Sequence, residues 1–251
     1  MKTFVISLEE SHERRKRVEK LLLEQGVTFL FFDAVNIKTT KIEQYPHYNA
    51  VKTLQKKGYK LTNPEIGCYL SHYKAWQNCI ELNEPIFVLE DNIKICTDLT
   101  EYLAFAQKNI QTLGIIKLGS YFTKRWSKVC AVNNDINLVK YNKGGSGASS
   151  YMITPLVAQR YVSLSTEFYL AVDDFMDMEY RTNIPLFTLS PNVIARSTVQ
   201  STIGSRKIKG KLTIRKKLHI ELGRVAHQIK RERFNLKFYT QIRKIKNKIQ
   251  V

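Results

Sequence analysis

The chain has 251 residues, 43% of them hydrophobic, which is enough to fill the core of one large α/β domain or of two small ones. Its formal net charge is +18, and residues 206–251 hold 16 of its 40 Lys and Arg but only 2 of its 22 acidic residues. No stretch reaches the roughly 18 apolar residues of a membrane span, and the first residues turn acidic too soon for a secretory signal, so we expect a cytoplasmic protein.

The first predicted unit is a strand, a helix and a second strand. Residues 3–8 form the first expected strand, and Ser11 is the expected N-cap of a helix that ends at Gly26. Residues 27–32 return as the second strand, and this alternation is typical of a βαβ unit in a parallel sheet. Residues 36–60 are rich in Lys and Tyr, and we expect a loop region there that borders the functional site.

A second alternation follows. Asn63 is the expected cap, and Pro64 the first helical position, of a helix that runs to Leu82. This helix leads into a strand at 86–89. The further expected elements are a helix at 99–107, a strand at 114–118, a strand at 151–153 after a glycine-rich turn at 144–150, and a helix at 155–164.

The four cysteines show no C-x-x-C spacing, which argues against a zinc site and against a secreted disulfide framework. They are Cys68, Cys79, Cys96 and Cys130. Cys68 and His72 stand four residues apart on a predicted helix and could share a metal ion, but they lack further ligands. A packed, reduced thiol is therefore the interpretation that we favour for Cys68.

The most informative segment runs from a buried strand directly into polar residues: residues 86–89 are apolar, and Glu90, Asp91 and Asn92 follow. Such a run predicts a strand that delivers polar side chains to its carboxyl edge, where open α/β sheets bind ligands. Carboxylates at that edge can hold a hard divalent cation against a diphosphate. The segment suggests a nucleotide-diphosphate site, although two acids after a strand can also cap a turn or face solvent.

Beyond Ser205 the apolar residues step by four, three and four. They form two predicted amphipathic helical stripes surrounded by Lys and Arg: Leu218, Leu222, Val225 and Ile229, then Phe238, Ile242, Ile245 and Ile249. The stripes could pack on the core or on each other, or bind an anionic membrane surface. Nucleic-acid binding is a further alternative, but the rest of the chain lacks basic clusters interleaved with exposed aromatics.

Seven short elements follow one another along the chain. They are Val5-Ile6-Ser7-Leu8 with Glu13-Arg14-Arg15; Phe32-Asp33-Ala34; Glu65-Ile66-Gly67-Cys68-Tyr69-Leu70-Ser71-His72 with Trp76; Val88-Leu89-Glu90-Asp91-Asn92; Gly147-Ala148-Ser149-Ser150-Tyr151-Met152-Ile153; Ala171-Val172-Asp173-Asp174; and Ser201-Thr202-Ile203-Gly204-Ser205. In this order and spacing they resemble glycosyltransferase family 25, which includes bacterial lipooligosaccharide galactosyltransferases and collagen galactosyltransferase domains. The resemblance covers roughly residues 2–205.

This resemblance implies an α/β fold of the GT-A type, a nucleotide-sugar-binding domain with a Rossmann-like, mostly parallel sheet. The glycosyltransferase domain would be residues 1–205, and residues 206–251 would be a basic helical extension. The family transfers a sugar, usually galactose, from a UDP-sugar with inversion. Inverting transfer needs a base for the acceptor hydroxyl and positive charge for the departing diphosphate.

The resemblance also implies roles for individual residues. The residues expected to bind the donor nucleotide-sugar are Ser7, Leu8, Arg14, Ala34, Ser71, His72, Glu90 and Asp91. Those expected on the acceptor side are Ser149 and Tyr151, the catalytic carboxylates are Asp173 and Asp174, and the metal ligands are Asp91 and Asn92. Residues 201–205 would fold over the donor.

The sequence leaves two of these assignments undecided, the cofactor and the catalytic base. The expected cofactor is Mn²⁺ or Mg²⁺, but Asn92 stands where the family typically has an acid, so a mechanism in which Arg14 or another basic residue neutralises UDP is the alternative. By correspondence with the family, Asp173 is the expected base, and two carboxylates so close raise the pKa of one of them, which would help a base near neutral pH. Asp174 is the second candidate, and Asp173 could instead cap the following helix.

The leading hypothesis is an inverting glycosyltransferase that adds a hexose, with UDP-galactose as donor, to a lipooligosaccharide or lipopolysaccharide core. The acceptor would be lipid-linked, and the enzyme peripheral on the inner face of the cytoplasmic membrane, held there by residues 206–251. One alternative is a nucleotide- or glycan-binding protein with weakened catalysis, suggested by Asn92. The other is nucleic-acid binding through the basic tail.

Overall fold

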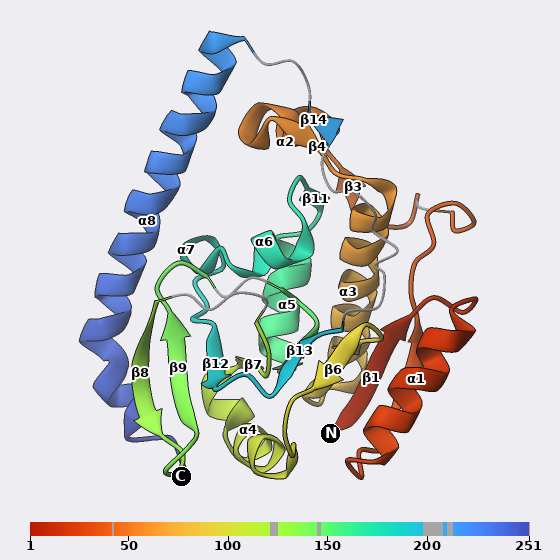
Figure 1. Ribbon diagram of the computed structural model, residues 1–251. Helices are drawn as coiled ribbons and strands as arrows, with labels where there is room; N and C mark the ends of the chain where they lie inside the picture. Colours follow the sequence, from red (N-terminus) through yellow and green to blue (C-terminus); the bar gives the residue numbers. More distant parts are fainter. Residues whose placement is uncertain (42, 121–124, 145–146, 198–207, 210–212, 251) are drawn as a thin grey trace.

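The computed structural model describes residues 1–41, 43–120, 125–144, 147–197, 208–209 and 213–250 (Figure 1). A central eight-stranded sheet has the order β2-β1-β5-β10-β7-β12-β9-β8. Its strands are β1 (Lys2–Ser7), β2 (Leu30–Asp33), β5 (Ile86–Glu90), β7 (Ile115–Lys117), β8 (Trp126–Ala131), β9 (Asn137–Tyr141), β10 (Ser150–Ile153) and β12 (Phe187–Ser190). Only β9 and β10 run opposite to the other strands of this sheet, so the predicted mostly parallel α/β sheet is confirmed.

Short two-stranded pairs surround this sheet. They are β3 (His47–Tyr48) with β11 (Glu167–Phe168), β4 (Tyr59–Lys60) with β14 (Ile208–Lys209), and β6 (Ile93–Ile95) with β13 (Ile194–Arg196). The expected elements at 201–205 lie outside the described residues.

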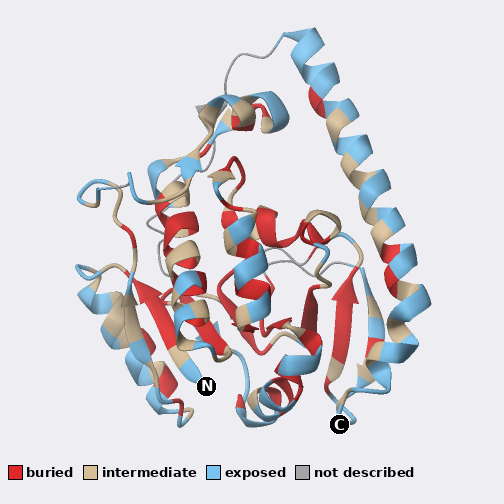
Figure 2. Cartoon of the chain, turned by 180° about the vertical axis from the view of Figure 1, so that it is seen from behind, coloured by how far each residue is buried: buried red, intermediate tan, exposed pale blue. Residues whose placement is uncertain are grey.

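Helices cover both faces of the sheet (Figures 1 and 2). They are α1 (His12–Leu23), α2 (Ala50–Lys57), α3 (Asn63–Leu82), α4 (Thr100–Leu113), α5 (Pro155–Ser163), α6 (Val172–Met176), α7 (Glu179–Thr182) and α8 (Ile214–Lys246). Side chains alternate along a strand, so Phe4 and Ile6 belong to the core cluster under α3, α5 and α6, whereas Val5 belongs to the cluster under α1 and α4. This arrangement buries the sheet on both sides.

The register of the first strands positions the functional site. Strand β1 pairs in parallel with β2 and with β5, opposing Ser7 to Asp33 and Ile6 to Glu90. All three strands therefore end at one edge of the sheet. The polar residues that follow β5 emerge beside the end of β1, and the backbone N–H of Asp91 donates to the Ile6 oxygen at 3.2 Å.

The N-cap of helix α3 lies one residue earlier than the sequence suggested. Its N-cap is Thr62, not Asn63: the Thr62 hydroxyl accepts from the Glu65 N–H, and the Glu65 carboxylate accepts from the Thr62 N–H. This reciprocal pair is the capping box that Thr-x-x-Glu encodes. The predicted end at Leu82 is confirmed.

The loop expected at residues 36–60 contains a helix. Helix α2 begins after Asn49, whose side chain accepts from the Lys52 N–H at 2.8 Å, and it ends at Gly58 in the left-handed conformation. The prediction of a continuous loop was therefore wrong, because both helix-end signals were overlooked among the Lys and Tyr residues.

Apart from Ile249, which follows its end, the two apolar stripes beyond Ser205 lie on one continuous helix, α8, and have different environments. In the second half of α8, Phe238 is buried. Ile242, Ile245 and the following Ile249 pack against the core cluster under α1 and α4. The stripe in its first half, Leu218, Leu222, Val225 and Ile229, is 49–61% exposed. Among the described residues no helix is long and apolar enough to span a membrane.

Gly67 lets α3 approach the loop after β2, and we expect Gly67→Ala to destabilise the protein. A Cβ at this position would lie 2.6 Å from the backbone oxygen of Val35. The loop or the helix would have to move, and overpacking of this kind costs about 1–3 kcal/mol. The measurement is the free energy of unfolding in denaturant.

Gly223 provides the matched control for this substitution. It lies within α8, and a Cβ there would meet nothing within 4 Å. Gly223→Ala should therefore raise stability by about 0.5–1 kcal/mol through helix propensity. If both substitutions shift the unfolding free energy alike, the close approach at Gly67 does not constrain the fold.

Candidate functional site

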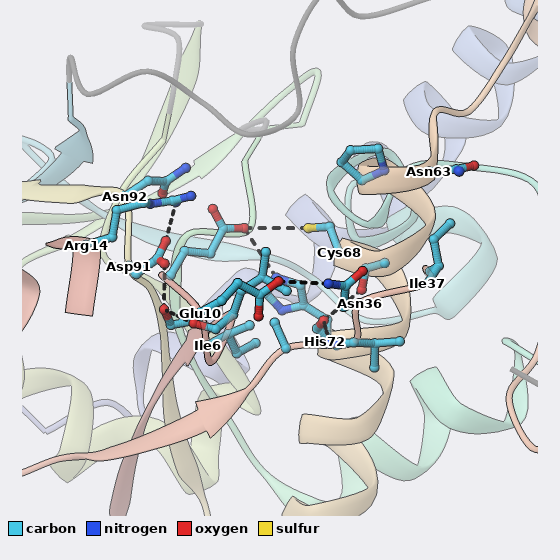
Figure 3. A pocket seen from close by; sticks show the side chains of 18 of the residues that line it. Ile6, Glu10, Arg14, Asn36, Ile37, Asn63, Cys68, His72, Asp91 and Asn92 are labelled. Atoms are coloured by element: carbon cyan, nitrogen blue, oxygen red, sulfur yellow. Dashed lines mark hydrogen bonds and ion pairs between the residues drawn. The ribbon is translucent and has the colours of Figure 1, made fainter. Parts of the chain in front are cut away.

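A cavity of about 300 Å³ opens where the carboxyl ends of β1 and β5 meet α1 and α3 (Figure 3). It is lined by all of the residues expected to bind the donor: Ser7, Leu8, Arg14, Ala34, Ser71, His72, Glu90 and Asp91. Asn92, the second expected metal ligand, lines it as well. The parallel pairing of the first strands gathers these residues, which are far apart in the sequence, at one edge of the sheet.

Asp91 is held on the α1 side of the cavity. Ser7 Oγ donates a 2.7 Å hydrogen bond to Asp91 Oδ2, and Arg14 forms an ion pair with Asp91 Oδ1. Arg17, one turn further along α1, donates to the backbone oxygens of Asp91 and Ile93 at 2.6 and 2.9 Å. Burial raises the pKa of Asp91 above its ordinary value, although Ser7 and Arg14 act in the opposite direction.

Glu90 lies on the other side of the cavity, where its side chain contacts two residues of α3. Its Oε1 lies 3.3 Å from His72 Nε2 and 3.8 Å from Cys68 Sγ. Burial acts to raise the pKa of Glu90, but the hydrogen bond from His72 and the charge of nearby arginines outweigh it and lower the pKa below its ordinary value. Glu90 is therefore an anionic hydrogen-bond acceptor inside the cavity.

Hydrogen bonds behind His72 fix the orientation of its ring. Trp76 Nε1, which can only donate, lies 2.9 Å from the Tyr151 hydroxyl, and that hydroxyl lies 2.9 Å from His72 Nδ1. Tyr151 accepts from Trp76, so its own proton is directed at His72 Nδ1. In the neutral imidazole the ring proton is then on Nε2, facing Glu90.

The two residues expected on the acceptor side are not part of the cavity lining. Tyr151 is fully buried, and its hydroxyl contacts the cavity residue His72. Ser149 is also buried, and its backbone oxygen accepts a 2.9 Å hydrogen bond from the Glu90 N–H. Both residues support Glu90 and His72 from behind.

Asp173 and Asp174 lie on α6, outside the lining of the cavity. Asp173 accepts from the backbone N–H of Asp174 at 2.9 Å and from that of Gly147 at 3.4 Å. Burial, followed by the charges of Asp174 and Asp177, raises the pKa of Asp173 above its ordinary value. Asp174 is 43% exposed and forms an ion pair with Lys57 at 2.7 Å. The two adjacent carboxyls thus have different environments.

A short segment connects Asp173 with the cavity. Gly147 contacts Asp173, and two residues later Ser149 contacts the backbone of Glu90. The N-cap of α6 is Ala171, so Asp173 does not cap that helix. Asp173 is a half-buried carboxyl with a raised pKa, one short segment away from the end of β5.

Asp91 and Asn92 carry the kind of oxygen ligands that a hard divalent cation prefers, and both Asp91 oxygens already bind Ser7 or Arg14. Asn92 Oδ1 is buried and has no hydrogen-bond partner among the residues that the structure describes, so it can serve as an oxygen ligand. The charged side chains that line the cavity are Glu10, Glu90, Asp91, Arg14 and Lys38. Acids outnumber bases in this set, so a diphosphate needs further positive charge to bind there.

The loop expected to border the site does line the cavity beside α3, although none of its individual residues was predicted as a site residue. Residues 35–38 line the cavity, and the Val35 N–H donates to Ser71 Oγ at 2.8 Å. Asn36 also donates to Glu10 at 2.8 Å. Gly67 in the first turns of α3 could have indicated this contact, because the absence of a side chain there permits the close approach of the loop.

Comparisons with known proteins point to one family of enzymes. The family model described as "Glycosyltransferase family 25 (LPS biosynthesis protein)" matches residues 1–176. The chain is 27% identical over 206 residues to the "Lipooligosaccharide biosynthesis protein lic2B" of Haemophilus influenzae, covering 76% of this chain and 74% of that protein. It is 28% identical over 193 residues to the human "Procollagen galactosyltransferase 2", covering 70% of this chain and 30% of that protein.

One solved structure that resembles the chain is a glycosyltransferase involved in the glycosylation of the major capsid of PBCV-1. The superposition has a TM-score of 0.45 at 8% sequence identity, and it covers 89% of this chain and 98% of the other.

Proposed function

The chain belongs to glycosyltransferase family 25 and is a glycosyltransferase, and on this premise we propose that it transfers a hexose from a UDP-hexose to a lipooligosaccharide or lipopolysaccharide core with inversion. The observation that carries the donor assignment is the convergence of eight expected residues on one cavity. The description of the Haemophilus influenzae relative supports the acceptor class. The procollagen galactosyltransferase supports galactose as the first donor sugar to test.

The proposal assigns separate tasks to the two sides of the cavity. On the α1 side, Arg14 lies where a diphosphate needs positive charge, and Asp91 with Asn92 would hold Mg²⁺ or Mn²⁺. A cation bound there would supply Lewis-acid stabilisation of the UDP leaving group. On the α3 side, the anionic Glu90 accepts hydrogen bonds from hydroxyl groups of the donor. Asp173 takes the proton of the acceptor hydroxyl.

Arg14→Met tests the donor side. Charged hydrogen bonds contribute about 1.5–3 kcal/mol, so we expect UDP to bind roughly 10- to 100-fold more weakly to this variant. The measurement is calorimetric titration with UDP. Lys20→Met on the same helix is the matched control, because Lys20 is 80% exposed and should leave UDP affinity unchanged. Equal UDP affinity for wild type and Arg14→Met would contradict the placement of the diphosphate beside α1.

The lipid-linked acceptor and the location at the inner membrane face also belong to this proposal, and the first half of α8 supports them. Its aliphatic stripe from Leu218 to Ile229 is 49–61% exposed and belongs to neither core cluster of the described residues. Residues 214–233 carry seven Lys and Arg and two acids, and each basic residue near an anionic membrane adds about 1 kcal/mol of attraction. Aliphatic insertion and charge would act together there.

Vesicle flotation tests this location. We expect the wild type to float with vesicles that contain anionic lipid, and Leu218→Gln with Leu222→Gln to reduce binding by about tenfold or more, because two exposed leucines no longer enter the lipid. Leu156→Gln on α5 is the control, since Leu156 is 76% exposed on a different surface. Undiminished flotation of the double variant would contradict the assignment to α8, and a concentration-dependent change in its oligomeric state would indicate self-association instead.

A further inference from the structure

The α3 side of the cavity carries three potential ligands for a second kind of metal ion. Cys68 and His72 are four residues apart on α3 (Figure 3). Glu90 ends β5, and its Oε1 contacts both of them. Their ligand atoms all lie within 4.8 Å of one another. We propose that these three residues bind a transition-metal ion of the Zn²⁺ class, separate from the hard cation at Asp91 and Asn92.

Two of the three distances between the ligand atoms suit a tetrahedral ion, and the third, between Cys68 and His72, is within 4.8 Å. Zn²⁺ binds nitrogen and oxygen at about 2.0–2.2 Å and sulfur at about 2.3 Å, so tetrahedral ligands stand roughly 3.3–3.8 Å apart. Glu90 Oε1 lies 3.3 Å from His72 Nε2 and 3.8 Å from Cys68 Sγ. An ion can therefore take the place of these two contacts with little movement of the backbone.

Metal binding through His72 Nε2 requires the other tautomer of the ring. A metal-binding imidazole keeps its proton on the other ring nitrogen and donates it to a second group, which fixes the ring. His72 Nδ1 lies 2.9 Å from the Tyr151 hydroxyl, which can accept that proton. When the ion binds, the His72 proton moves from Nε2 to Nδ1, and the thiol proton of Cys68 is released to solvent.

The ligand types separate this site from the one beside α1. A thiolate and an imidazole prefer Zn²⁺ or Co²⁺, whereas a carboxylate and an amide oxygen prefer Mg²⁺ or Mn²⁺. Three protein ligands leave a fourth position, and since all three residues line the cavity, that position opens into the space proposed for the donor. The ion would thus compete with the UDP-sugar. This competition alone rests on the proposed function, whereas metal binding does not.

Co²⁺ titration of the purified full-length chain tests the site directly. A thiolate-bound, tetrahedral Co²⁺ gives a sulfur-to-metal charge-transfer band and intense visible bands, and we expect both to saturate at one equivalent. Zn²⁺ should bleach these bands, and Mg²⁺ at the same concentration should not. Cys68→Ser should abolish the charge-transfer band, whereas Cys96→Ser, at an exposed thiol elsewhere, should leave it unchanged.

Two results would overturn the proposal. One is the absence of any thiolate band in the wild type, and the other is a band that persists in Cys68→Ser but is lost in Cys96→Ser. Asp91→Asn separates the two metal sites, because it should weaken Mn²⁺ binding while leaving the Co²⁺ spectrum intact. A Co²⁺ spectrum as expected in a protein that binds no UDP would uphold this site and reject the proposed function.

Discussion

Asp173→Asn is expected to lower the rate of sugar transfer by about 10²- to 10⁴-fold, the usual contribution of a general base, while UDP affinity changes less than about twofold. The carboxyl lies outside the donor cavity, so its loss should affect the chemical step and not donor binding. Its Oδ1 accepts the Asp174 N–H, and an amide oxygen can keep that hydrogen bond. The measurement is single-turnover transfer together with UDP titration.

The neighbouring carboxyl provides the control. Asp174 is 43% exposed and paired with Lys57, so Asp174→Asn should change the rate by only a small factor. If Asp174→Asn is the slow variant and Asp173→Asn is not, the base is the exposed carboxyl. That outcome would contradict the role that the raised pKa of Asp173 suggests.

The pH dependence of the rate follows from the same pKa shift. A base must be deprotonated, and burial with the nearby charges raises the pKa of Asp173. The rate should therefore fall as the pH drops through a value above the ordinary pKa of an aspartate. A carboxyl with a raised pKa in the folded state also loses stabilising free energy as the pH rises through that pKa, so Asp173→Asn should be at least as stable as the wild type at neutral pH.

Lys140→Met is expected to lower the free energy of unfolding by about 3–5 kcal/mol, which corresponds to a fall of roughly 6–20 °C in Tm for a chain of this size. Lys140 is fully buried on β9, and its Nζ donates to Glu179 at 2.9 Å, Asn235 at 2.8 Å and the Tyr141 backbone oxygen at 3.3 Å. These contacts tie α7 and α8 to the sheet. Their loss leaves the Glu179 carboxylate buried without its cation.

A second substitution distinguishes lost packing from the unpaired charge. Glu179→Gln added to Lys140→Met removes the buried charge but keeps an oxygen for the Leu186 N–H, which Glu179 Oε1 accepts at 2.7 Å. The double variant should recover part of the stability. Lys52→Met is the surface control, because Lys52 and Glu167 are both about 40% exposed and should contribute less than about 1 kcal/mol. No recovery in the double variant would assign the loss to packing alone.

The first strands and the cavity could be predicted because the sequence signals there are local. The apolar residues of β1 and β5 end in polar residues, and a parallel sheet brings such ends together without further information. The β9 strand was not predicted, and the reason is also physical. Lys140 interrupts the apolar pattern of this strand, and a lysine is expected to face solvent. Its burial is possible because Glu179 and Asn235, which are distant in sequence, accept hydrogen bonds from it.

The two stripes of α8 show that sequence periodicity alone does not predict which helix face is buried. Both have the same spacing of aliphatic and aromatic residues, yet Phe238 packs against Phe187 of β12 with ring centroids 5.9 Å apart, while Leu218 is 61% exposed. Whether a stripe is covered depends on which strands lie beside it. The third ligand near Cys68 was missed for the same reason, because Glu90 reaches α3 from a different element.

The most direct test of the central claim is UDP release from a panel of UDP-sugars by the purified protein, with and without EDTA, compared with Asp91→Asn. The account predicts turnover of one UDP-hexose, with UDP-galactose the first to examine, that EDTA suppresses and that Asp91→Asn abolishes. If no UDP-sugar is bound or turned over by the wild type under any of these conditions, the cavity between α1 and α3 is not a donor site.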